Sequence, residues 1–493
     1  MSYRTRSKNF LAKAEGSNGE IQDGDNEEKY DSSSELRHSS FRFQGSKVPI
    51  YWRYIVLLSL LWVFVVHYYE RVVVKRSMNV CQWKKWEQWS EGDERHRVAL
   101  FADPQIMDNH SYPGRPAIVN HVTRLILDNY HKRDWKFVQY HLDPDTNFFL
   151  GDLFDGGRYW DDDYWHKEYI RFNSIFPKKP MRRTVMSLPG NHDIGFGDTI
   201  IESSLKRFST YFGETSNYLN AGNHTFVLLD TISLSDKQNV NISNVPKQFL
   251  EDFASVEHEY PRILLSHVPL YRNPEQQKCG SLRESNKPFP LMKGIQYQTV
   301  IDQEISQEVL TKVQPSILFS GDDHDYCHIT HSYLANGESK VAEEITVKSC
   351  AMNMGISRPA IQLLSLHNPS PAKGAVDTAT AKTYQTNICY MPDPYKAMKA
   401  YVFTLIITVI LSISIYFFPA MFNKKVVLQM EKKFKKPYVA LPLPVSTSLD
   451  PSSWLVTSAY YVNENSSILG FLIHAIIMTL SILSIFTFYY STV

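Results

Sequence analysis

Residues Phe148–Gly157 read FFLGDLFDGG, and the rest of the chain can be interpreted by comparison with them. An apolar run ends in Gly-Asp, and a second carboxylate and two glycines follow. The pattern predicts a buried strand that ends at Asp152, where Gly156 and Gly157 would let a ligand approach the backbone. Since a carboxylate has two oxygens, Asp152 can bridge two metal ions. Taken alone, the motif also fits a plain strand-to-turn transition.

Four other apolar or β-branched runs end in side chains that can bind metal ions. These segments are Arg97–Gln105 (RVALFADPQ), Thr184–Asp193 (TVMSLPGNHD), Arg262–Pro269 (RILLSHVP) and Ser316–His324 (SILFSGDDH). In α/β sheets, ligands bind at the carboxyl ends of the strands. We therefore expect the five segments to be strands of an α/β domain whose ends meet at one site.

The motifs D-x-Q, GDxxDGG, GNHD, SH and GDDH occur in this order, and together they resemble the calcineurin-like metallophosphoesterase superfamily over roughly residues 97–366. The stretches ADPQIMD, FLGDLFDGGR, GDDHDYC and CYMPDPY are similar to its membrane-bound members that trim glycosylphosphatidylinositol (GPI) anchors. This resemblance implies a hydrolase with a four-layer α/β/β/α sandwich. It also implies the substrate, an ethanolamine phosphate on a GPI mannose, with the first mannose favoured.

The resemblance also assigns a role to each site residue. It implies one metal ion held by Asp103, Gln105, Asp152 and His324, and a second held by Asp152, Asn191, His267 and Asp322. His192 would protonate the leaving group, and Asp193 would orient the His192 imidazole. Arg158 would bind a phosphate oxygen, with a merely solvated surface arginine as the alternative.

Two of these ligands depart from the superfamily pattern. Gln105 stands where histidine is common, and Asp322 stands where the first histidine of GHxH is common. Both changes add oxygen donors, which suit Mn²⁺ or Mg²⁺ better than Zn²⁺. We therefore expect two divalent ions, with Mn²⁺ favoured, and whether Gln105 binds a metal ion stays open.

The polar residues beside these ligands allow several interpretations. Asp155 is expected to cap a turn, and His224 and His328 are expected to be structural. Asp323 and Asp325 either orient nearby histidines or bind the ammonium group of the substrate.

Three apolar segments are long enough to cross a bilayer and divide the chain. The expected organisation is a disordered cytosolic tail (1–46), a first membrane helix (48–69), a linker (70–94), a luminal metallophosphoesterase domain (95–398), a second membrane helix (399–421), a basic cytosolic loop (422–467) and a third membrane helix (468–490).

The membrane topology follows from the basic loop. Residues 423–436 contain six lysines and one acidic residue, and positively charged loops stay in the cytosol. Three crossings then place the catalytic domain on the luminal side, where the glycosylation sequons at Asn109, Asn223 and Asn241 are accessible and the one at Asn465 is not. The expected location is the endoplasmic reticulum membrane, with the Golgi as the alternative.

Composition sets further limits. The net charge is +1 at pH 7, which gives no electrostatic case for nucleic-acid binding. None of the five cysteines (Cys81, Cys279, Cys327, Cys350 and Cys389) is in a CxxC pair, which argues against a zinc–thiolate site. In an oxidising lumen up to two disulfides and one leftover thiol are expected, with buried free thiols as the alternative. Trp83, Trp86 and Trp89 either form an interfacial belt or pack on the domain.

The sequence therefore predicts a membrane-anchored two-metal phosphodiesterase that acts on GPI-anchored proteins or GPI lipid. Two alternatives stay open. One is another two-metal phosphoesterase, acting on monoesters or nucleotides. The other is a non-catalytic receptor for GPI-linked cargo.

Overall fold

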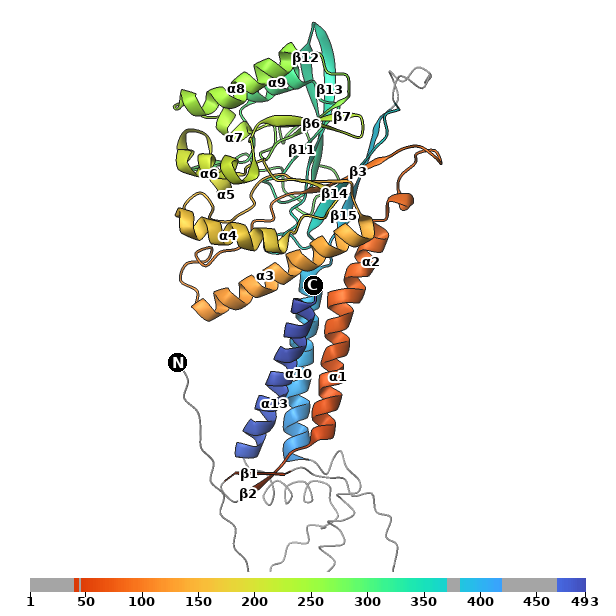
Figure 1. The fold of residues 1–493 in the computed structure, drawn as a ribbon, viewed down its shortest axis with the longest axis vertical. Coiled ribbons are helices and arrows are strands. Elements are labelled where there is room, and N and C mark those ends of the chain that lie inside the picture. Colours follow the sequence, from red (N-terminus) through yellow and green to blue (C-terminus); the bar gives the residue numbers. More distant parts are fainter. Residues whose placement is uncertain (1–39, 44–45, 370–381, 419–467) are drawn as a thin grey trace, which may run out of the picture. The chain divides into compact units, whose positions relative to one another are not determined.

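The computed structural model describes residues 40–43, 46–369, 382–418 and 468–493 (Figure 1). The chain divides into two units, residues 1–51 and 52–493. In the first unit, β1 (Ser40–Phe43) and β2 (Ser46–Pro49) pair as an antiparallel hairpin. Residues 40–43 and 46 of these strands belong to the tail that the sequence predicts to be disordered (1–46), and the rest of that tail lies outside the described residues.

The second unit contains two large mixed sheets. The five-stranded sheet has the order β15-β14-β3-β4-β5, with bounds Tyr384–Tyr390, Ala360–Leu366, His96–Phe101, Thr146–Phe149 and Arg183–Val185. The six-stranded sheet has the order β12-β13-β11-β8-β7-β6, with bounds Cys327–Ala335, Glu338–Thr346, Ile317–Ser320, Arg262–Leu265, His224–Leu228 and Asn217–Ala221. A small hairpin adds β9 (Lys293–Gly294) and β10 (Tyr297–Gln298).

The side chains of each strand point alternately to the two faces of its sheet, and they belong to two separate hydrophobic cores. Val98 and Leu100 of β3 join a core with Phe226 of β7 and Phe319 of β11, which lies between the sheets. Their neighbour Phe101 faces the other way and packs in the core that also contains helix residues. Because successive side chains of a strand point to opposite faces, each sheet buries one face on the other sheet and one on helices. The predicted four-layer α/β/β/α class is confirmed.

Helices cover the outer faces, with α3 beside α4 and α8 beside α9 (Figure 1). The helices of the domain are α3 (Ala117–Phe137), α4 (Asp162–Ile175), α5 (Asn191–Ile194), α6 (Glu202–Phe212), α7 (Thr231–Leu234), α8 (Val240–Ser255) and α9 (Gln303–Val313). Short 3₁₀ or π turns are η2 (Trp83–Lys85), η3 (Val138–Leu142) and η4 (Gly197–Thr199).

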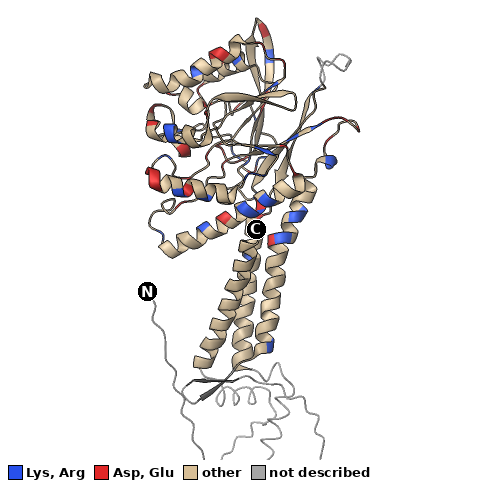
Figure 2. Ribbon diagram, in the orientation of Figure 1, with Lys and Arg blue, Asp and Glu red and all other residues tan. Residues whose placement is uncertain are grey.

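Among the described residues, three helices are long and apolar enough to cross a membrane. The first runs from Trp52 to Val80 through α1 (Trp52–His67), the π turn η1 (Tyr68–Val72) and α2 (Val73–Val80). The others are α10 (Pro394–Phe417) and α13 (Ile468–Ser491). Figure 2 shows how few charged residues α1, α10 and α13 carry.

The bounds of these helices differ from the expected ones. The first helix continues to Val80, so residues 70–80 of the expected linker are helical. The second begins at Pro394, five residues earlier than expected, and residues 419–421 of the expected span lie outside the described residues, as does the basic loop. The third ends at Ser491 instead of residue 490.

The junction between the first helix and the domain is closely packed. A disulfide joins Cys81 to Cys389 of β15, a second joins Cys279 to Cys327, and Cys350 is a buried free thiol. The indole N–H of Trp83 donates to the Leu142 carbonyl at 2.6 Å. Trp86 donates to the Cys81 carbonyl and packs against the core of the domain, and Trp89 donates to the Ser365 hydroxyl, so the packing interpretation of the three tryptophans is favoured.

Candidate metal centre

The five segments that the sequence singles out form or adjoin strands β3, β4, β5, β8 and β11. Within their sheets, β3, β4 and β5 are parallel to one another, and β8 is parallel to β11. Because parallel strands bring their carboxyl ends to one edge of a sheet, the loops that follow these strands converge.

The side chains meet around His267. Ligand atoms of Asp103, Asp152 and His267 all lie within 4.8 Å of one another. His267 Nε2 lies 3.4 Å from an Asp152 carboxylate oxygen, 3.6 Å from one of Asp322 and 3.3 Å from the Asn191 side-chain oxygen. The other ring nitrogen, Nδ1, donates to the Leu150 carbonyl at 2.7 Å, which directs Nε2 toward the cluster.

Three oxygens of the predicted ligands have no hydrogen-bond partner. They are Oδ2 of Asp103, Oδ2 of Asp322 and Oε1 of Gln105, and all three are buried. Buried polar atoms in folded proteins are almost always bonded, so an orphaned set at one place needs an explanation. Divalent cations that prefer oxygen donors would satisfy all three atoms, and the donor set therefore fits the metal ions that the sequence predicts.

The electrostatics of the cluster also call for positive charge. Burial raises the pKa of Asp103 well above its ordinary range, and the carboxylates of Asp152 and Asp322 raise it further. Burial by itself would lower the pKa of His267. Nearby carboxylates, of which Asp152 has the largest effect, instead raise this pKa to about 10. Buried acids crowded in this way are stable only beside a proton or a cation.

Five predicted ligands have a left-handed backbone conformation. The φ angles are +47° at Asp103, +36° at Gln105, +49° at Asp152, +64° at Asp322 and +64° at His324. This region is uncommon for residues other than glycine and costs of order 1–3 kcal/mol each. Such strain gathers at functional sites, where the surrounding structure holds it in place.

Two glycines give the loops room to approach. A Cβ on Gly190 would lie 2.1 Å from an Asp152 carboxylate oxygen, and one on Gly151 would lie 2.5 Å from Nδ1 of His267. The expectation that Gly156 and Gly157 leave room for a ligand stays a prediction. A Cβ on Gly156 would lie 2.5 Å from the Asp108 carboxylate and 2.7 Å from the Trp160 ring nitrogen, and one on Gly157 would lie 3.2 Å from Phe154, so both glycines also make room for protein side chains.

His192 is held by Asp155, which the sequence does not assign to this role. Nδ1 of His192 lies 2.6 Å from the Asp155 carbonyl oxygen and 3.4 Å from its carboxylate. A carbonyl only accepts, so Nδ1 is the donor and Nε2 is the nitrogen left for proton transfer.

The expected role of Asp193 is corrected accordingly. Its carboxylate accepts backbone N–H bonds from Leu153, Phe154 and Gly190. It therefore ties the GNHD loop to the loop that carries Asp152, and it acts on the site by fixing those two loops. Burial raises the pKa of Asp193 to about 7.

Three further predicted residues are Gln105, His324 and Arg158. Gln105 donates its side-chain N–H to Asp155 at 2.9 Å, which leaves its oxygen available to a metal ion. Burial lowers the pKa of His324, and Asp322 and Asp152 counteract this effect. Arg158 donates to the Asn191 carbonyl at 2.9 Å, so it braces a predicted ligand, and phosphate binding by its remaining N–H groups stays a prediction.

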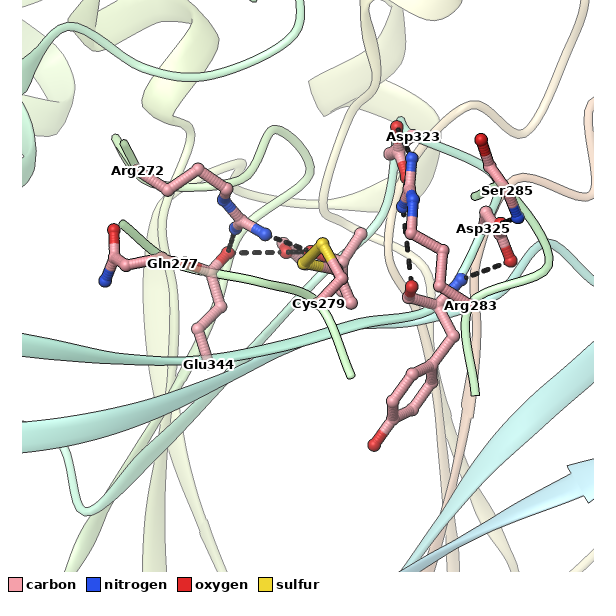
Figure 3. The surroundings of a disulfide bond; sticks show 12 residues. Arg272, Gln277, Cys279, Arg283, Ser285, Asp323, Asp325 and Glu344 are labelled. Carbon is pink, nitrogen blue, oxygen red and sulfur yellow. Dashed lines mark hydrogen bonds and ion pairs between the residues drawn. A yellow bond between two sulfur atoms is a disulfide. The ribbon is translucent and has the colours of Figure 1, made fainter. Parts of the chain in front are cut away.

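Asp323 and Asp325 are occupied by other groups of the protein (Figure 3). Arg283 forms a bidentate ion pair with Asp323. Asp325 accepts from the backbone N–H groups of Glu284 and Ser285 and from Lys348 at 2.9 Å. These contacts fix the loop of residues 276–298 beside the predicted ligands Asp322 and His324, and they disfavour the ammonium-binding interpretation.

The same loop reaches the centre itself. The carbonyl of Gln296 accepts the side-chain N–H of Asn191 at 3.2 Å. The Cys279–Cys327 disulfide joins this loop to β12. The sequence analysis missed Arg283, because its ion pair with Asp323 joins residues 40 positions apart.

A family profile and two curated proteins match this chain. The profile of the calcineurin-like phosphoesterases matches residues 96–326. The chain is 59% identical over the full length of both proteins to Cell division control protein 1 of Saccharomyces cerevisiae. It is 28% identical to Metallophosphoesterase 1 of Xenopus laevis, covering 53% of this chain and 65% of that protein.

Among solved structures, one described as GAP50, the anchor in the inner membrane complex of Plasmodium, is 13% identical. It covers 62% of this chain and 94% of that one with a TM-score of 0.31, which is too low to compare the folds in detail.

Proposed function

The chain belongs to the calcineurin-like phosphoesterase family and is a phosphoesterase hydrolase, and on this premise we propose that it is a Mn²⁺-dependent phosphodiesterase of GPI anchors. The reaction is the hydrolysis that releases ethanolamine phosphate from a mannose of the glycan, the first mannose being favoured. The substrate rests on the resemblance of motifs such as FLGDLFDGGR and CYMPDPY to the membrane-bound trimming enzymes.

The observation that carries the proposal is the set of orphaned oxygens on Asp103, Asp322 and Gln105. Carboxylate and amide oxygens favour Mn²⁺ over Zn²⁺. Asp103, Gln105, Asp152 and His324 would hold one ion, and Asp152, Asn191, His267 and Asp322 the other. When bound, a pair of divalent ions neutralises the charge of the phosphodiester and activates water.

The protein itself supplies positioning and a proton. Asp155 orients His192, whose Nε2 would protonate the departing mannose oxygen. Arg158, which the Asn191 carbonyl holds at the edge of the site, would bind a phosphate oxygen. The Leu150 carbonyl keeps His267 in the orientation that a metal ligand needs.

The three apolar helices support a lipid-linked substrate, because an enzyme and a lipid held in the same membrane meet in two dimensions. We propose that the domain faces the lumen of the endoplasmic reticulum. The lysines of residues 423–436 support this orientation, since basic loops remain cytosolic.

A profile of GPI glycans tests this function. Cells that lack the protein should retain an ethanolamine phosphate on GPI-linked proteins, which wild-type protein removes and a His192→Ala variant does not. Mass spectrometry that finds normally trimmed glycans in the variant cells would refute the substrate. Purified full-length protein should also cleave bis-p-nitrophenyl phosphate in preference to the monoester, and the reverse preference would indicate a phosphomonoesterase.

A further inference from the structure

A cavity of about 610 Å³ lies between α3 of the domain and the ends of the three membrane helices, and we call it the junction pocket. Its walls include Tyr69 and Val73 of the first helix, Val122 of α3, Ala397 of α10 and Phe486 of α13. The volume is in the range of pockets that bind small molecules. The metal centre lies elsewhere, because the predicted ligands do not line this cavity.

The mouth of the junction pocket is apolar. Four residues line the pocket and are also 43–56% exposed, namely Val122, Leu125, Met398 and Leu483. They come from α3, α10 and α13, two of which are membrane-spanning candidates. An opening with an apolar rim on such helices gives access to hydrocarbon more readily than to water.

The floor of the junction pocket is polar and buried. Glu70 is 3% exposed and pairs with Arg133 at 3.0 Å, and it also accepts from the Tyr401 hydroxyl at 2.7 Å. The Asn129 amide nitrogen donates to the same carboxylate at 3.0 Å. The charges are therefore paired, and a ligand need not carry a charge of its own.

One acceptor on this floor has no partner. Asn129 is 5% exposed, and its side-chain oxygen is buried without a hydrogen bond. The amide cannot be turned around, because a carboxylate only accepts and Glu70 fixes the nitrogen. With less than 1 Å² of exposed surface, this oxygen faces the protein interior and not the open cavity, so it does not define the ligand.

We propose that the junction pocket binds a hydrocarbon chain of an inositol lipid, because its apolar, partly exposed lining lies on helices that are candidates to span the membrane. This inference rests on the proposed function, whose substrate belongs to the same lipid class. The apolar rim accepts the chain, and the charged groups of the floor are already paired with one another.

The pocket is connected to the metal centre through a short segment. Met352 lines the pocket, and Ser349, three residues earlier, donates its hydroxyl to the carbonyl of Asp103 at 2.9 Å. A lipid that packs against Met352 therefore contacts the segment that braces a predicted metal ligand.

The first test is photocrosslinking of the full-length protein in phosphatidylcholine vesicles that contain phosphatidylinositol with a diazirine on one acyl chain. Crosslinks should map to α3 and the first residues of α10, and Val122→Trp and Leu125→Trp should reduce them. Val119→Trp is the matched control, since Val119 is as exposed as Val122, at 46%, and lies outside the pocket.

Two results would overturn the proposal: crosslinks confined to other faces of the helices, or crosslinks unchanged by both pocket variants. Both pocket positions are half-exposed, so a larger side chain there leaves the buried core intact.

The second test compares two substrates. The pocket variants should lower kcat/KM for the GPI substrate about tenfold, the effect of losing roughly two buried methylene groups. Hydrolysis of bis-p-nitrophenyl phosphate should not change, because this ester has no chain. Equal effects on both substrates would contradict the pocket assignment. Absence of diester hydrolysis by the wild-type protein would contradict the proposed function. The crosslinks would still show whether the junction pocket binds lipid.

Discussion

Substituting Gly190 by alanine tests the convergence of the loops without changing any predicted ligand. The added Cβ would lie 2.1 Å from an Asp152 carboxylate oxygen and 2.2 Å from its backbone nitrogen. Ordinary contacts of a Cβ atom are about 3.4 Å or longer. To restore such a distance, one of the two loops must move by more than 1 Å. The clash is with backbone, and a side-chain rotation cannot relieve it.

The size of the effect follows from this displacement. A misplacement of about 1 Å at a catalytic site can cost about 10²-fold in rate. We therefore expect Gly190→Ala to lower kcat for bis-p-nitrophenyl phosphate about a hundredfold, and to lower the bound Mn²⁺, because Asp152 serves both proposed ions.

Gly294→Ala is the matched control, since the nearest atom to its added Cβ is 4.0 Å away and its φ is not positive. Both variants are assayed as full-length protein, with kinetics and metal content measured on the same sample. A Gly190→Ala enzyme with wild-type kcat and metal content would show that the loop bearing Asp152 need not meet the GNHD loop closely.

Other regions of the fold give further predictions. Burial lowers the pKa of His224 to about 4. As the pH drops from 6.5 toward 4, His224 is therefore protonated in the unfolded chain but not in the folded protein, and the stability of the fold falls. His224→Asn should remove about 2 kcal/mol of the stability difference between pH 7 and pH 5, as read from melting curves. Arg133→Met leaves Glu70 unpaired and should cost about 3–5 kcal/mol of stability, whereas a loss under 1 kcal/mol would argue against a buried pair. If the domain is luminal, Asn241→Gln should remove one glycan, visible as faster gel migration, and an unglycosylated wild-type protein would argue against that orientation.

Periodicity and local motifs were sufficient to predict the strands and the loops of the centre. The apolar runs ending at residues 101, 149, 265 and 320 are strands, because their composition fits buried positions of a parallel sheet. A turn that the sequence analysis did not predict follows β7, which ends at Leu228 before Thr231 begins the short helix α7. The Asp230 side chain caps that helix by accepting from the Ser233 N–H, a local signal that apolar composition hides.

Roles that depend on contacts distant in sequence could not be predicted. The sequence places Asp193 beside His192, yet its carboxylate turns to the backbone of residues 153 and 154, and Asp155 contacts the imidazole instead. The pairing of Cys81 with Cys389 spans 308 residues and leaves no local trace. The buried pair of Glu70 and Arg133 is likewise formed only when α3 packs on the first membrane helix.

The most direct test of the metal centre is to count and pair its ions. Full-length protein loaded with Mn²⁺ should contain two ions per chain by mass spectrometry of the metal, with the coupled electron paramagnetic resonance spectrum of two neighbouring ions. Asp152→Asn should lose that coupling, because it removes the shared carboxylate. A wild-type protein with no bound ion or only uncoupled ions, or an Asp152→Asn protein with an unchanged spectrum, would contradict a two-metal centre bridged by Asp152.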